Sequence, residues 1–166
     1  QSTMLPFVLI GDVGLTPTEF GLGMLVQTGS YLAGSIALRK VSHHISGHRA
    51  VVIGLCFSAT GGIVMALSVA LLPPSFLSIM IPVGICTFGI AFVSPHIITV
   101  GMAPFPHIAG SASAMMGFIQ MSCGFLGGLA AAMIGAPLLA FGTVIPFMEF
   151  MAVGSYLAYL AFDRRT

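Results

Sequence analysis

Residues 50–72, with the sequence AVVIGLCFSATGGIVMALSVALL, form an apolar stretch long enough to cross a membrane as a single helix. A helix needs about 20 residues to span the roughly 30 Å hydrocarbon core of a bilayer. The uncharged region is much longer than this, because no charged residue occurs from position 50 to position 148. We therefore predict several membrane-spanning helices that are joined by turns without charge.

The composition of the whole chain of 166 residues agrees: apolar residues make up 57%, charged residues only 5%, and the mean hydropathy is +1.09. Soluble domains carry about 25% charged residues, because a surface in contact with water must be polar. The composition therefore excludes a soluble enzyme and a disordered tail. A net charge of +1 also excludes a nucleic-acid-binding protein, which needs a basic surface.

Clusters of proline, glycine and serine divide the apolar sequence, since such clusters mark turns. They occur at residues 73–75, 104–107 and 135–137, and a further uncharged segment precedes them at residues 20–38. We predict an all-α membrane protein, a polytopic helical bundle of five complete transmembrane helices plus the end of a sixth. The complete helices are expected at residues 17–38, 50–72, 77–103, 108–134 and 145–162, and the end of the sixth at residues 1–10.

The basic residues indicate how the bundle is oriented. All five lie either at residues 39–49 or at positions 164 and 165, close to the C-terminus. Four predicted spans separate these two segments, so both segments lie on the same side of the membrane. Short segments rich in Lys and Arg stay in the cytoplasm. We therefore expect a cytoplasmic C-terminus, with Asp12 and Glu19 on the outer side.

The segment Thr16-Pro17-Thr18-Glu19 predicts where the first complete helix begins. In a capping box, the Thr16 hydroxyl accepts a hydrogen bond from the Glu19 amide, and the Glu19 carboxylate accepts one from the Thr16 amide. Pro17 suits the first helical position, because the amide hydrogen that it lacks has no partner there. Glu19 is therefore expected to have a structural role.

Small residues recur along the segment at residues 108–134. Gly110, Gly117 and Gly124 stand at every seventh position, and Gly124 forms a GxxxG pair with Gly128. Helices in lipid associate through such residues, because small side chains let the backbones approach closely. We therefore predict that this glycine face packs against other helices.

Two glutamines lie deep in apolar segments. Gln120 shares its helical face with Gly117 and Gly124, and Gln27 shares a face with Gly34. Both side chains are therefore expected to point toward protein rather than lipid. They either form hydrogen bonds between helices or line a cavity that holds a substrate, and the sequence leaves both possibilities open.

Glu149 is the only acidic residue inside an apolar segment. A carboxylate within a membrane is costly, so its presence suggests a function such as proton coupling. Glu149 also lies 14 positions before Asp163, about 21 Å along a helix, which places it toward the outer end of its predicted span. The sequence favours this interfacial position, where an acid suits an early helical turn. Proton or substrate coupling is the alternative.

Histidines and cysteines show no signature of a metal, a cofactor or a disulfide. His96 lies near the expected cytoplasmic end of its helix, which indicates a packing role in a wet environment. Motifs such as GxSxG, HExxH and the P-loop are absent, so we predict that the chain is not an enzyme. The other histidines of interest, His43, His44 and His48, suit a hydrated basic loop, and the cysteines, Cys56, Cys86 and Cys123, occur singly.

Three stretches follow an order typical of one family. They are residues 6–10 with Gly14-Leu-Thr-Pro-Thr-Glu-Phe-Gly21, the set Gly34, Arg39, Gly47 and Arg49, and Pro104-Phe-Pro-His-Ile-Ala-Gly-Ser-Ala-Ser-Ala114 with Gly117-Phe-Ile-Gln120. Together they resemble the C-terminal half of a major facilitator superfamily transporter, and more closely the Bcr/CflA-type bacterial drug:proton antiporters. They are similar, in turn, to the join between helices 7 and 8, to a cytoplasmic loop motif, and to the start of helix 11. The loop departs from the full motif, since it has no Asp between Gly34 and Arg39.

The resemblance implies two six-helix halves that rock against each other around a central cavity. The chain would be the C-terminal half, in the lipid bilayer of the bacterial inner membrane. Together with the missing N-terminal half, it would exchange protons for amphipathic drugs or metabolites. No cofactor is implied. The alternatives are a non-transporting helical scaffold or assembly subunit, and a major facilitator transporter of another substrate class. The cavity candidates are Gln27, Thr87, Phe88, Phe92 and Gln120, and Glu149 is the candidate for proton coupling.

Overall fold

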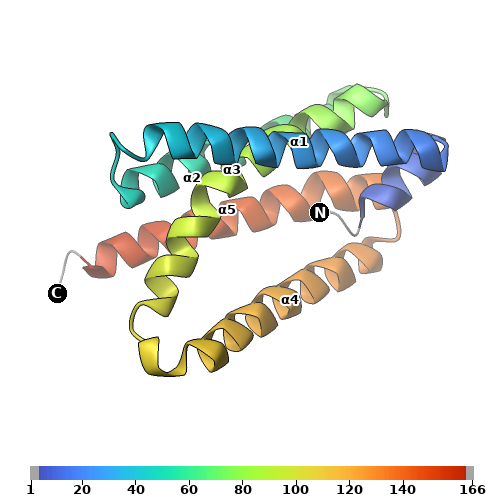
Figure 1. The fold of residues 1–166 in the computed structure, drawn as a ribbon. Coiled ribbons are helices and arrows are strands. Elements are labelled where there is room, and N and C mark those ends of the chain that lie inside the picture. The colour runs from blue at the N-terminus through green and yellow to red at the C-terminus, as the bar shows by residue number, and fades with distance from the viewer. Residues whose placement is uncertain (1–3, 164–166) are drawn as a thin grey trace.

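A computed structural model describes residues 4–163, and these residues form helices and short connections without any strand (Figure 1). Five long helices occupy most of this part of the chain, and two short helical turns precede α1 and α4. The long helices are α1 (Pro17–Val41), α2 (Gly47–Leu71), α3 (Phe76–Met102), α4 (Ala109–Ile134) and α5 (Pro137–Asp163), and the short ones are the π-helical turn η1 (Phe7–Asp12) and the 3-10 turn η2 (Pro106–Ile108).

Four segments of the described chain are long and apolar enough to cross a membrane: α2, α3, η2 together with α4, and α5 up to Phe162. α1 is as long as α2 but is not among them, although the sequence predicted a span at residues 17–38. Its middle carries the polar run Gln27-Thr28-Gly29-Ser30-Tyr31, which lowers its hydropathy. The prediction of an all-helical chain is thus confirmed for the described residues, and four of its helices have the length and composition of membrane spans.

α5 begins at Pro137, well before the position near Ile145 that the sequence suggested. Gly135 adopts a left-handed conformation with φ of 70° and ends α4, so the connection between α4 and α5 is very short. Pro146 lies inside α5 without ending it. Transmembrane helices tolerate an internal proline, because neighbouring groups satisfy the freed backbone. The early start of α5 changes the depth at which its side chains lie.

The backbones of α2 and α3 approach each other closely at two glycines. A Cβ atom at Gly54 would lie 2.7 Å from the Gly89 carbonyl oxygen, and one at Gly89 would lie 2.6 Å from the Gly54 carbonyl oxygen. Gly34 has the same role between α1 and α3, where a Cβ atom would lie 2.8 Å from the Ala91 Cβ. Small residues therefore hold these three helices together, as expected for helices in lipid.

A group of fully buried apolar side chains joins the N-terminal residues to the long helices. Leu5, Val8 and Leu9 are completely buried and pack against side chains of α2, α3 and α5. This part of the core also includes Phe141, which precedes the predicted start of its helix. Residues 5–9 thus anchor the short turn η1 to the bundle.

α4 stands apart from the other helices (Figure 1). Its main contact is with α5, where Gly127 faces the Met148 side chain. The predicted packing face is wrong for contacts within this chain, since a Cβ atom at Gly110, Gly117, Gly124 or Gly128 would meet nothing within 4 Å. The buried residues of α4 are Gly127 and Ala131, one turn apart near the C-terminal end of the helix. The regular glycine face therefore points into open space.

The predicted capping box at the start of α1 is confirmed. The Thr16 amide donates to a Glu19 carboxylate oxygen at 2.8 Å, and the Glu19 amide donates to the Thr16 hydroxyl at 3.3 Å. The hydrogen bonds from the Thr16 backbone and then from its side chain hold the pKa of Glu19 below its ordinary value. Glu19 thus fixes the end of a helix.

Candidate functional site

Glu149 lies in the middle of α5, not near the end of a helix. At about 1.5 Å per residue, it is roughly 18 Å from Pro137 and roughly 21 Å from Asp163 along the axis. The interfacial position that the sequence favoured rested on a helix beginning near Ile145. Because α5 begins earlier, the carboxyl group lies at mid-length of the bundle, where its environment is partly buried.

Ser58, in the middle of α2, is the hydrogen-bond partner of Glu149. Its hydroxyl donates to Oε2 of Glu149, and the Ser58 side chain itself is only 2% exposed. α2 and α5 lie in contact at this level: a Cβ atom at Gly62 would lie 3.4 Å from the Pro146 Cα and 3.6 Å from the Glu149 Cβ, which are ordinary van der Waals distances.

Cys86 brings α3 to the same point. Its thiol donates to the Ser58 carbonyl oxygen with a sulfur–oxygen distance of 3.7 Å, and its side chain is fully buried. A Cβ atom at Gly61 would collide with Cys86, its backbone nitrogen being 2.8 Å away. Three helices therefore meet at Ser58, and we call Ser58, Cys86 and Glu149 the mid-bundle site.

The chemistry of the mid-bundle site follows from its single carboxyl group. An ionised carboxylate at this depth is costly unless donors face it, and Ser58 supplies one donor. A serine hydroxyl can both donate and accept, so it can also serve a protonated carboxyl group. The pair can therefore hold the carboxyl group in either protonation state. Among the side chains that the structure describes, no three His, Cys, Asp or Glu residues gather to hold a metal ion.

The predicted cavity residues do not line one cavity. Thr87 is 7% exposed and donates to the Val83 carbonyl oxygen at 2.7 Å, while Phe92 is 4% exposed. These two side chains belong to the packed core around α3 rather than to a cavity wall. Gln27 is half-buried in the middle of α1, and the structure places it in neither of the two cavities described next.

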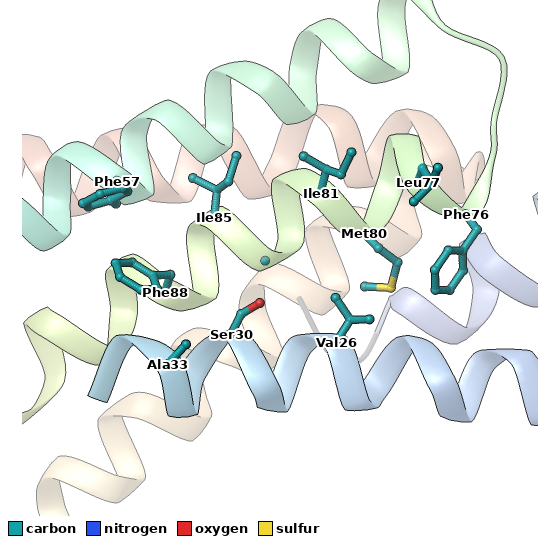
Figure 2. Close-up of a pocket in the computed structure, with 11 residues that line it drawn as sticks. Val26, Ser30, Ala33, Phe57, Phe76, Leu77, Met80, Ile81, Ile85 and Phe88 are labelled. Carbon is teal, nitrogen blue, oxygen red and sulfur yellow. The ribbon is translucent and has the colours of Figure 1, made fainter. Parts of the chain in front are cut away.

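Phe88 lines a groove of about 470 Å³ between α1 and α3 (Figure 2). Its ring makes an edge contact with Phe57 of α2, with centroids 5.1 Å apart. Ser30 points into the groove from α1 and supplies the hydroxyl in an otherwise apolar lining. The groove therefore suits an apolar occupant such as a lipid chain.

Gln120 lines a different cavity, of about 530 Å³, between the second half of α3 and the first half of α4. Ser94 and Ser113 add hydroxyl groups to its lining, and Met102 and Met116 add flexible apolar side chains. Methionine adapts to occupants of irregular shape. Of the predicted cavity residues, Gln120 thus has the setting best suited to contact a ligand.

The residues of the predicted loop motif lie around the connection between α1 and α2. Gly34 lies where α1 crosses α3, and Gly47 lies directly against the ring of His96. The Arg39 carbonyl oxygen accepts a hydrogen bond from the Ser42 hydroxyl at 2.9 Å, in the last turn of α1. The Arg39 and Arg49 side chains are exposed. The two glycines therefore serve helix packing.

Sequence reasoning missed Ser58, because one serine in an apolar helix is an ordinary feature. Its partner Glu149 lies 91 positions away, so no local pattern joins them. No signal in the sequence pointed to the pair, since the predicted helix start near Ile145 put Glu149 close to the end of its helix.

Comparison of the chain with protein-family models, with curated proteins and with solved structures finds no match.

Proposed function

We propose that the chain is the C-terminal half of a proton-coupled membrane transporter, of the Bcr/CflA type within the major facilitator superfamily, that exchanges protons for small amphipathic molecules. The observation that carries the proposal is the carboxyl group of Glu149 at mid-length of a bundle of apolar helices, hydrogen-bonded to Ser58. Ionisable groups at such depth are rare and commonly belong to proton pathways.

In this proposal the Ser58–Glu149 contact couples protonation to helix packing. A proton on Glu149 removes the charge, which lowers the cost of exposing the side chain to an apolar environment. α5 can then shift relative to α2. When the proton is released, the Glu149 carboxylate is charged again and needs the hydrogen bond from Ser58. Because Cys86 and Ser58 tie α3 to α2, α5 is the element that moves.

The uncovered glycine face of α4 supports the proposal that the transporter has a second half. Gly110, Gly117, Gly124 and Gly128 offer a surface on which another helix can lie closely, and none of residues 4–163 covers it. The cavity that contains Gln120 lies beside this face. In a two-half transporter it forms part of the wall of the substrate path, with methionines that accommodate varied substrates.

The proposal is tested with the full-length gene product reconstituted in proteoliposomes, with ethidium as an amphipathic substrate and a pH-sensitive dye inside. We expect substrate-driven proton movement that Glu149→Gln abolishes and Ser58→Ala weakens by roughly tenfold, since one hydrogen bond to a charged group is lost. Glu19→Gln is the matched control, because it alters a carboxyl group outside the core. Transport by Glu149→Gln at the wild-type rate would refute the role of Glu149.

A helical scaffold without transport activity is the second candidate. The scaffold is favoured by the burial of Thr87 and Phe92, because two of the predicted cavity residues are then part of the packed core. A scaffold predicts that the full-length product moves neither ethidium nor protons, and that Glu149→Gln changes stability alone. The same proteoliposome experiment therefore separates the two candidates.

A further inference from the structure

A second polar cluster lies at the end of the bundle where α2 begins and where α3 and α5 end. A cavity of about 370 Å³ opens there, and ring side chains from three helices line it. His48 comes from the first turn of α2, His96 from α3, and Tyr156 and Tyr159 from α5. We call this cavity the His–Tyr pocket. It shares no residue with the mid-bundle site.

The rings of the pocket are held in place by direct contacts. The Tyr156 hydroxyl lies 3.0 Å from Nδ1 of His48, within hydrogen-bond distance, and the two ring centroids are 5.5 Å apart. Tyr159 stacks on Tyr156 with centroids 6.1 Å apart. His96 lies against Gly47, at a place where a Cβ atom would collide with the imidazole. The glycine thus lets the ring from α3 reach the beginning of α2.

The polar end of the pocket suits an anion. Imidazole N–H groups and tyrosine hydroxyls donate hydrogen bonds, and no acidic residue is among the lining side chains. Arg39 and Lys40 end α1 and Arg49 begins α2 at this same end of the bundle. The free amides in the first turn of α2 add a partial positive charge. Asp163, the last residue of α5, is an acid at the same end of the bundle, but the three basic side chains outnumber it and favour a negative group.

The other wall of the pocket is apolar and extends toward the middle of the bundle. Leu55 lies seven positions after His48 in α2, about 10 Å deeper along the helix, and Val93 and Ile97 face the cavity from α3. In a membrane, the ring end lies at the level of the lipid headgroups, where tyrosine is common, and the apolar wall lies at the level of the chains. The pocket thus combines an anion-binding end with a wall for hydrocarbon.

We propose that the His–Tyr pocket binds an anionic phospholipid of the surrounding leaflet. His48, through Nε2, and His96 donate to the phosphate of the headgroup, while the Tyr156 hydroxyl donates to Nδ1 of His48 and orients its ring. One acyl chain lies against Leu55, Val93 and Ile97. A cavity of this volume takes the headgroup and the first part of a chain, within the usual size of a small-molecule site. This site does not depend on transport activity.

The test uses the purified chain in detergent micelles, with lipid binding counted by native mass spectrometry. Dioleoylphosphatidylglycerol is titrated against dioleoylphosphatidylcholine, which has the same chains and no net charge, and against inorganic phosphate, which has no chains. We expect phosphatidylglycerol to bind roughly tenfold more tightly than phosphatidylcholine, because of hydrogen bonds to a charged group. Inorganic phosphate should bind far more weakly, since it gains nothing from the apolar wall.

Two variants locate the site. Tyr156→Phe removes one hydroxyl and keeps the ring, and His48→Ala removes one imidazole; each should weaken phosphatidylglycerol binding roughly tenfold without changing phosphatidylcholine binding. His43→Ala, in the exposed loop outside the pocket, is the matched control and should bind as the wild type does. Far-UV circular dichroism confirms that each variant is folded. Equal affinity for the two lipids, unchanged binding by both pocket variants, or preferential binding of a cationic amphiphile such as dodecyltrimethylammonium would overturn the proposal.

Discussion

Replacing Gly89 by alanine adds one methyl group at a place where the backbones of α2 and α3 lie close together. The new Cβ would stand 2.6 Å from the Gly54 carbonyl oxygen and 2.8 Å from the Ser58 amide nitrogen. Both atoms belong to the backbone of α2, so neither can move unless the helix moves. Ordinary contact begins at 3.4 Å, and to widen the shorter distance from 2.6 Å to that value the helices must separate by about 0.8 Å.

A separation of this size weakens every contact along the helix pair. A gap of about 0.5–1 Å removes a quarter to a half of the dispersion energy of each atom pair. Because lipid gives helices no hydrophobic reason to associate, this loss is not offset elsewhere. We expect Gly89→Ala to lower the free energy of unfolding by about 1–3 kcal/mol, the usual cost of overpacking. The folding equilibrium constant then falls roughly 5- to 150-fold.

The assay is unfolding of the purified chain in dodecyl maltoside micelles with increasing dodecyl sulfate, followed by far-UV circular dichroism. Gly110→Ala is the matched control, because a Cβ atom there meets nothing within 4 Å. Alanine favours a helix over glycine by up to about 1 kcal/mol, so the control should unfold at the same or a higher dodecyl sulfate fraction. Equal unfolding midpoints for the two variants would refute the close approach of α2 and α3.

Two further predictions concern α1. The pKa of Glu19 is held below its ordinary value of 4.5, so its capping contribution is complete above that pH and is lost as the pH falls through the lowered pKa. Unfolding midpoints of the wild type should therefore decline between about pH 5 and pH 3 more than those of Glu19→Gln, and parallel declines would contradict the capping role. If α1 crosses the membrane despite its polar middle, Asp12→Cys should react with an impermeant maleimide in intact cells, and His43→Cys should react only after the membrane is opened. Labelling of both from one side would show that α1 does not span.

Local signals in the sequence predicted most helix ends. Proline and serine at residues 73–75 mark the connection between α2 and α3, and Thr16 with Glu19 forms the expected cap. The start of α5 was placed too late, because apolar residues 138–144 can belong to a helix or to a buried turn. Only the contacts of Phe141 and Gly142 with the core distinguish these two possibilities.

The candidate site could not be predicted, because it depends on contacts between distant helices. Periodic spacing drew attention to Gly110, Gly117 and Gly124, yet these glycines touch no other helix of the chain. Gly47, Gly54 and Gly61 of α2 stand at the same seven-residue spacing and do pack against α3. Regular spacing identifies a surface that another helix can use, but it does not say which helix uses it.

The two glycines at the crossing of α2 and α3 also have a mechanical consequence. With their carbonyl oxygens this close to the opposite backbone, α2 and α3 cannot slide along each other without forcing a larger residue into the same gap. They form one stiff block. At the contact between α4 and α5, by contrast, Gly127 meets the thioether of Met148, a side chain with several rotatable bonds. The contact between α4 and α5 therefore yields more easily than the contact between α2 and α3.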